Sequence, residues 1–199
     1  MVDYKLQKVD NDNIQSFQKG FTLIEFIVVV FIILLLTGAV IPIYRANKEE
    51  LKLKQSAQVI AYSLRRVSEM AMSSQEIGPP GAKIIPSGGY GLYFEKIVSG
   101  DKIVLFADCD KSHLYEPDPN QCGSFPEKIE EIPLEKGVVI DSFFPPSSSL
   151  VISFEPPDPT VYVNGFEAMS ESQIILSLIS DPSKKVIISI QKTGLINVK

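Results

Sequence analysis

One carboxylate stands inside the most apolar stretch of the chain. Glu25 is the only charged residue between Phe21 and Tyr44, and every residue from Phe26 to Leu36 is apolar. A helix that crosses a bilayer needs about 20 apolar residues, and this stretch has that length. An ionisable side chain in such a segment is costly, so it normally has a partner or a function. Glu25 is therefore a candidate functional residue.

The second half of the chain holds a short run of side chains with oxygen ligands. They stand at alternate positions and then at the ninth place of the run: Asp108, Asp110, Ser112 and Glu116. This spacing resembles the first part of an EF-hand-type calcium loop, which turns several oxygens toward one ion. The sixth place holds His113 rather than glycine, and the twelfth holds Pro119 rather than glutamate. Two interpretations stand: a calcium site, or an acidic loop exposed to solvent.

The only two cysteines, Cys109 and Cys122, bracket this acidic loop. An even cysteine count in an oxidising compartment favours a disulfide, and a loop this short would stabilise the fold by about 3 kcal/mol. Two free thiols are the alternative. His113 is the only histidine and is expected to be a solvated loop residue. No phosphate-binding glycine loop, zinc-type ligand pair or catalytic triad is indicated, so we expect no enzyme.

The elements that must position these residues can be read from periodicity. After Tyr44, apolar residues recur at spacings of three and four. They are Leu53, Ala57, Ile60, Leu64, Val67 and Ala71. This pattern predicts an amphipathic helix whose apolar stripe packs on a sheet. A glycine- and proline-rich stretch from Gly78 to Gly81 follows, so the helix is predicted to run from about Thr22 to Ser74.

Beyond Gly81 the pattern changes to short β-favouring runs separated by turn residues. The predicted strands are 90–94, 103–106, 128–132, 138–141, 150–154, 161–164, 174–179, 186–190 and 195–198. Short strands after a long helix predict an α+β fold, with an antiparallel sheet or small β-sandwich packed on the helix. The segments are a polar leader at 1–20, an apolar helix half at 21–44, an amphipathic half at 45–75 and a β-rich head at 81–199.

The charges are distributed unevenly along the chain. The formal net charge is −5, and residues 81–199 hold ten Lys/Arg against sixteen Asp/Glu. An acidic head repels phosphate backbones, so direct nucleic-acid binding is disfavoured. Lysines lie before the apolar stretch, and Arg45 and Lys48 lie soon after it, so charge does not give the orientation in a membrane.

The seven residues from Lys19 to Glu25 closely resemble the processing motif of type IV pilins and type II secretion pseudopilins. Gly20, Phe21 and Glu25 stand at the family's spacing, between a polar leader and an apolar helix. The resemblance implies that a prepilin peptidase cuts after Gly20 and that the same enzyme methylates the amine of Phe21. It also implies that Glu25 of one subunit pairs with the Phe21 amine of its neighbour. Segments 58–75, 89–94 and 188–196 loosely resemble minor pseudopilins.

The resemblance also implies a location and partners. The chain would be a single-pass inner-membrane protein with its head outside the cytoplasm, and then part of a periplasmic or extracellular filament. Its partners would be the prepilin peptidase/methyltransferase, other pilin or pseudopilin subunits and an inner-membrane assembly platform. Its function would be that of a structural subunit, a minor pilin or pseudopilin, of a type IV pilus-like or type II secretion filament.

Gly38 and Pro42 stand near the end of the apolar stretch. Glycine lowers helix propensity by about 1 kcal/mol, and proline removes a backbone hydrogen bond. In one interpretation the helix simply tolerates both residues, as membrane helices do. In the other, which comes from the family resemblance, segment 38–42 extends when a subunit enters a filament.

Three other interpretations compete for the whole chain. A signal peptide has a shorter apolar region than this stretch and a small-residue cleavage site after it. A plain membrane anchor explains the length but not Glu25. A membrane-tethered β-rich ectodomain with binding or enzymatic activity belongs to a different functional class. A deep head pocket lined by buried polar side chains would favour it.

Overall fold

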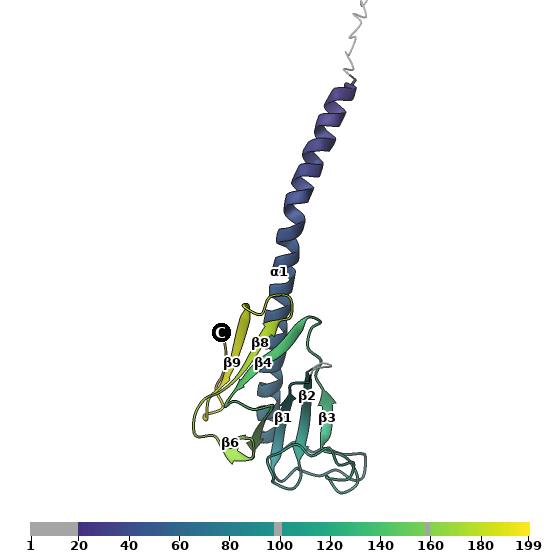
Figure 1. Cartoon of the computed structure of the whole chain (residues 1–199). Coiled ribbons are helices and arrows are strands. Elements are labelled where there is room, and N and C mark those ends of the chain that lie inside the picture. Colours follow the sequence, from purple (N-terminus) through teal and green to yellow (C-terminus); the bar gives the residue numbers. More distant parts are fainter. Residues whose placement is uncertain (1–19, 98–100, 158–159) are drawn as a thin grey trace, which may run out of the picture. The chain divides into compact units, whose positions relative to one another are not determined.

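The computed structural model describes residues 20–97, 101–157 and 160–199, and the side chains of residues 39–47 lie outside that description. The chain divides into two units, Met1–Tyr44 and Arg45–Lys199, and each is considered by itself. Figure 1 shows the elements of both units along the chain.

A single long helix links the two units in sequence. Helix α1 spans Leu23–Met72, close to the predicted limits. Ser74, with a φ of 46°, ends it in the left-handed region, where its N–H donates to the carbonyl of Ala71 at 3.0 Å. The apolar side chains between Phe21 and Leu36 are each at least 38% exposed. Within the described residues, no helix is both long enough and apolar enough for a membrane crossing.

The second unit contains two antiparallel sheets. The larger has the order β3-β2-β1-β5-β6-β7 and the smaller β10-β9-β8-β4. The larger sheet comprises β1 (Gly89–Glu95), β2 (Lys102–Asp108), β3 (Lys128–Glu131), β5 (Ser149–Glu155), β6 (Thr160–Val163) and β7 (Phe166–Glu167). The smaller comprises β4 (Val138–Phe144), β8 (Ser172–Leu178), β9 (Lys185–Ile190) and β10 (Ile196–Val198). All nine predicted strands are confirmed, and the two-residue β7 was missed.

The predicted apolar stripe of α1 forms the centre of the core. All six of its residues, from Leu53 to Ala71, are at most 1% exposed. They belong to one buried cluster with alternate residues of both sheets, such as Leu92 of β1 and Ile188 of β9. In Figure 1 the strands of the second unit lie along the C-terminal part of α1. The α+β prediction is confirmed, and the head is a two-sheet arrangement rather than a single sheet.

A further layer covers the other face of the larger sheet. Side chains alternate between the two faces of a strand, and Val104 and Phe106 of β2 point away from the main core yet are fully buried. The loop between β2 and β3 covers this face. Its Tyr115 ring lies 5.5 Å from the Phe106 ring, and its His113 ring stacks on Tyr162 of β6. This folded-back loop, residues 109–127, includes the cysteine-bracketed acidic loop identified in the sequence, and the name acidic loop is used for the whole of it below.

Candidate functional site

The start of α1 is closed by a reciprocal pair of side chains. Thr22 donates its backbone N–H and its hydroxyl to the Glu25 carboxylate, at 2.9 and 2.8 Å. The Glu25 N–H lies 3.3 Å from the Thr22 hydroxyl oxygen, which accepts from it. This is a capping box, in which an N-cap threonine and a glutamate three residues later satisfy otherwise free helix donors. The Thr-x-x-Glu spacing could have been read from the sequence, but it was overlooked.

The two residues at the predicted cleavage point precede this capping box. Gly20 and Phe21 are not helical. A Cβ built on Gly20 would meet nothing within 4 Å, and the Phe21 side chain is 89% exposed. Among the described residues, nothing crowds the peptide bond between them. Gly20, Phe21 and Glu25 lie within six positions of one another in the chain.

The two predicted weak points of the helix lie within α1. The backbone is helical at both Gly38 and Pro42. A Cβ on Gly38 would meet none of the described atoms within 4 Å, so nothing in the described part of the chain requires glycine there. The side chain of Pro42 lies outside the described residues. Loosening of this segment during assembly stays a prediction.

The acidic loop is closed by the predicted disulfide. Cys109 and Cys122 are bonded, with their Cα atoms 5.3 Å apart. Residue Asp108, at the end of β2, and residue Glu127, just before β3, stand at the two ends of the loop. The backbones pair there as well, since the Ala107 N–H donates to the Glu127 carbonyl at 2.9 Å.

Two fully buried carboxyl groups organise the base of this loop. Asp108 accepts hydrogen bonds from the backbone N–H groups of Lys111 and His113, both at 2.8 Å. Glu127 accepts from the N–H groups of Cys109 at 3.2 Å and Glu116 at 3.1 Å. Both carboxyl groups are 0% exposed. They replace backbone partners that an irregular loop lacks, which fixes the path of the chain.

The carboxyl groups at the loop base are close enough to influence one another. Asp108, Asp110 and Glu127 each place one carboxylate oxygen within 4.8 Å of the other two. Burial raises the pKa of Glu127 to about 7, and it also raises the pKa of Asp108. Burial would raise the pKa of Asp110 too, but hydrogen bonds with Ser112, Asp108 and Gln121 together outweigh it and lower that pKa. Such a cluster can hold a cation or retain protons near neutral pH.

The structure gathers half of the predicted calcium ligands. Asp108 and Asp110 lie together, but Glu127 rather than Glu116 completes the group of three acidic residues. The Glu116 carboxylate accepts a hydrogen bond from the Gln121 amide, and the Ser112 hydroxyl lies 3.4 Å from the Leu114 carbonyl. The sequence spacing gave no indication of Glu127, because this residue follows the loop and is placed near Asp108 by backbone pairing with the end of β2. Calcium binding at this loop stays a prediction.

His113 corrects one expectation. It was expected to be solvated but is only 8% exposed, with its ring 3.6 Å from that of Tyr162 and nearly parallel at 13°. Its Nδ1 lies 3.2 Å from the Asp108 carboxylate, and its Nε2 lies 3.7 Å from that of Glu155. The expectation was wrong because the loop packs on the sheet and buries the ring.

Comparison with known proteins decides what the N-terminal arrangement is. A model of the prokaryotic N-terminal methylation motif matches residues 15–41. The chain carries this methylation motif. The match covers the exposed Gly20–Phe21 bond, the capping box at Glu25 and the first part of α1. The comparison with curated proteins and the comparison with solved structures each found no match.

The methylation motif confirms the resemblance of the N-terminus to type IV pilins and pseudopilins. It indicates prepilin-type processing and a membrane-anchored N-terminus. The motif ends at residue 41, before the head begins. The likeness of the head to minor pseudopilins is therefore not confirmed, and the sites in the acidic loop stand on their geometry alone.

Proposed function

We propose that this chain is a structural subunit of a type IV pilus-like or type II secretion filament, a minor pilin or pseudopilin. A prepilin peptidase removes residues 1–20, and the same enzyme methylates the amine of Phe21. The chain then assembles through its N-terminal helix, without a catalytic role of its own. The single observation that carries this proposal is the methylation motif at residues 15–41.

Physical chemistry supports the assembly step. The apolar side chains from Phe21 to Leu36 are exposed in the single chain, and an apolar surface of this extent needs a membrane or a protein partner. The apolar stretch from Phe21 to Tyr44 supplies the length of a bilayer crossing before assembly. In a filament, the same surface would pack against the helices of neighbouring subunits.

Glu25 supplies the charge that this packing requires. Cleavage after Gly20 leaves a positive amine on Phe21, at the start of an apolar helix. A buried unpaired charge costs several kcal/mol, so a carboxylate from an adjacent subunit would strongly favour one axial position. We therefore propose that Glu25 pairs with the Phe21 amine of a neighbour. The other partners are the inner-membrane assembly platform and the prepilin peptidase.

Filament incorporation tests this proposal. The tagged chain is expressed with its own assembly genes, filaments are recovered both by shearing from the surface and by crosslinking in the periplasm, and the tag is measured in the filament and membrane fractions. Wild-type chain is expected in both fractions. A Gly20→Val variant should stay in the membrane fraction with its leader intact. Equal incorporation of the wild type and the variant into filaments would contradict the proposal. A wild-type chain found only as a free membrane protein would favour the tethered ectodomain instead.

A further inference from the structure

The two sheets of the head end in the strands β3, β7, β4 and β10, and two of these edges are protected by charged side chains. On β3, the exposed Glu130 pairs with Arg66 at 2.7 Å. On β10, the Arg65 guanidinium donates to the carbonyl of Ile196 at 3.4 Å. Charged side chains at a strand edge are a common protection against uncontrolled pairing.

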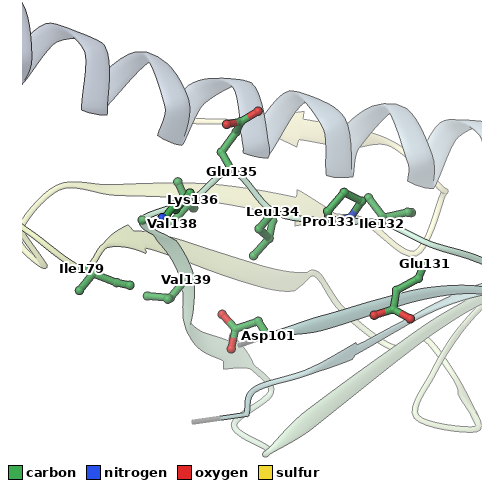
Figure 2. Close-up of a pocket in the computed structure, with 11 residues that line it drawn as sticks. Asp101, Glu131, Ile132, Pro133, Leu134, Glu135, Lys136, Val138, Val139 and Ile179 are labelled. Atoms are coloured by element: carbon green, nitrogen blue, oxygen red, sulfur yellow. The ribbon is translucent and has the colours of Figure 1, made fainter. Parts of the chain in front are cut away.

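The edge of β4 is closed by burial and by hydrogen bonds. Val138 and Ile140 are 5% and 0% exposed. Their N–H groups donate to the Glu135 carbonyl at 3.0 Å and to the Asp101 carboxylate. A cavity of about 590 Å³ lies beside this strand, and Figure 2 shows the Glu135 side chain of its lining directed toward α1. An added strand would therefore not pair along β4.

The edge of β7 differs from these three because it is both open and apolar. This strand ends the larger sheet and pairs only with β6. Its Phe166 is 79% exposed, and Met169, just beyond the strand, is 95% exposed. Within the described ranges, no ion pair or side-chain hydrogen bond covers the edge at Glu167, the other residue of β7. An exposed apolar edge of this kind is a place where another chain can bind.

The backbone of Glu167 is directed to this open edge. Tyr162 and Glu167 are opposed across the β6–β7 hairpin. The next two residues, Val161 and Ala168, form a hydrogen-bonded pair, since the Ala168 N–H donates to the Val161 carbonyl at 2.8 Å. In antiparallel strands such pairs alternate with pairs that lack these bonds. Glu167 therefore turns its N–H and its carbonyl away from β6, where both can bind an added strand.

The side chains at this edge favour a strand in which basic and apolar residues alternate. Opposed residues share a face of the sheet, so Glu167 lies on the face of Tyr162, whose hydroxyl donates to Glu155 at 2.9 Å. Glu155 pairs with Lys111 at 3.2 Å, whereas Glu167 forms no ion pair among the described residues. Phe166 lies on the opposite face. A second copy of the chain aligned at Glu167 would place two carboxylates opposite each other, which is unfavourable.

We propose that the edge of β7 binds an extended segment of a partner protein in which basic and apolar residues alternate. The segment pairs as an added strand with the N–H and the carbonyl of Glu167. A lysine or arginine lies opposite the Glu167 carboxylate, and an apolar side chain on the other face covers Phe166. This docking role goes beyond the filament function and does not rest on it, because it uses residues of the head alone.

The test uses the full chain in micelles of an uncharged detergent and three short fluorescent peptides. One alternates lysine and valine, one alternates glutamate and valine, and one repeats the first with a central proline, which blocks strand pairing. Fluorescence anisotropy, corrected for binding to empty micelles, is expected to show binding of the lysine peptide alone, weakened by salt. Glu167→Lys should weaken this binding by about fivefold or more. Glu69→Lys makes the same charge change at an exposed carboxylate of α1 and should bind the lysine peptide as the wild type does.

A second variant, Phe166→Asn, tests the apolar part of the edge and should weaken the lysine peptide by a similar factor. Both substituted side chains are exposed, so thermal unfolding followed by circular dichroism should match the wild type. Absence of binding, equal binding of all three peptides, or wild-type binding by both β7 variants would overturn the proposal. So would crosslinking of the chain to itself that the β7 variants abolish while no peptide binds, because the occupant would then be a second copy.

Discussion

The carboxylate of Glu25 accepts hydrogen bonds from both the backbone N–H and the hydroxyl of Thr22. This residue is also the one proposed to pair with the amine of a neighbouring subunit. The two roles use different properties of the side chain. Capping needs a hydrogen-bond acceptor of the right length, whereas pairing with an amine in an apolar bundle needs a negative charge. Substitutions can therefore separate them.

Glu25→Gln is expected to keep the helix start but lose assembly. Glutamine also completes a capping box, so membrane insertion and helix content should match the wild type. The loss of charge leaves the Phe21 amine unpaired, so incorporation into sheared filaments should fall as far as it does in Glu25→Ala. Thr22→Ala is the control, since it weakens the cap by about 1 kcal/mol and keeps the charge. Wild-type incorporation of Glu25→Gln would show that Glu25 acts only as a cap.

Leu64→Ala should destabilise the head through its anchoring helix. Leu64 is 0% exposed within the core, and emptying such a site costs about 2–5 kcal/mol. Tyr62→Ala, two residues away on the same helix but 66% exposed, should change the free energy of unfolding by only about 0.5 kcal/mol. Chemical denaturation of the full chain in detergent, followed by circular dichroism, measures both. Equal effects of the two substitutions would rule out packing of this helical stripe in the core.

Breaking the Cys109–Cys122 bond should loosen the acidic loop. The bridged residues are 13 apart in sequence, so the chain-entropy model gives about 3 kcal/mol of stabilisation. For a head of this size, that corresponds to a melting temperature lower by about 6–12 °C. A Cys109→Ser/Cys122→Ser variant and the chemically reduced wild type should show the same decrease. No decrease in either sample would mean that the packing against Tyr162 and Phe106 holds the loop alone.

The stability of the head should fall as the pH rises toward neutrality. The pKa of Glu127 is raised from 4.5 to about 7, mainly by burial. The folded head therefore binds this proton more tightly than the unfolded chain does, and that advantage is lost between about pH 4.5 and pH 7. The loss attributable to Glu127 is on the order of 3 kcal/mol. The raised pKa of Asp108 acts in the same direction.

Comparison of Glu127→Gln with the wild type isolates this contribution. Because glutamine does not titrate, the difference in unfolding free energy between the two proteins should change between pH 5 and pH 8, with the wild type losing more. Glu130→Gln, at an exposed carboxylate on the adjacent strand, should follow the wild type at both values. A difference that is constant with pH would contradict the assigned burial of Glu127.

Calcium is expected to restore the stability that the head loses as the pH rises. At pH 8 the three carboxyl groups at the loop base carry their charges, and a divalent cation would relieve their repulsion. Calcium should therefore raise the melting temperature at pH 8 and do so much less at pH 5, where the Glu127 carboxyl, with its pKa of about 7, is protonated. Asp110→Asn should reduce the effect, and Glu116→Gln, outside the cluster, should not. A head whose melting temperature is the same in calcium and in chelator would remove the calcium prediction.

Periodicity predicted the parts of the fold that are governed by local pattern. The apolar stripe from Leu53 to Ala71 and the nine strands follow from spacing that the backbone imposes. The strand β7 escaped notice because two residues carry no periodicity. The pairing order of the sheets was not predicted, since it depends on contacts between segments far apart in the chain.

The candidate site in the head was predicted only in part, for the same physical reason. Cys109 and Cys122 could be paired because they are the only cysteines. Glu127 and the burial of His113 depend on the loop folding back over the sheet, and no local signal encodes that. The N-terminal site was the opposite case. Its Gly20, Phe21 and Glu25 act within a few residues of one another, so their spacing alone carried the prediction.

The mass of the N-terminal peptide tests the central claim most directly. The chain is expressed with and without a prepilin peptidase, purified from membranes and digested, and its first peptide is identified by tandem mass spectrometry. We expect this peptide to begin at Phe21 and to carry one methyl group on its amine, and only when the peptidase is present. A chain that keeps residues 1–20 in the presence of the peptidase, or that is cut at another bond, would contradict the account.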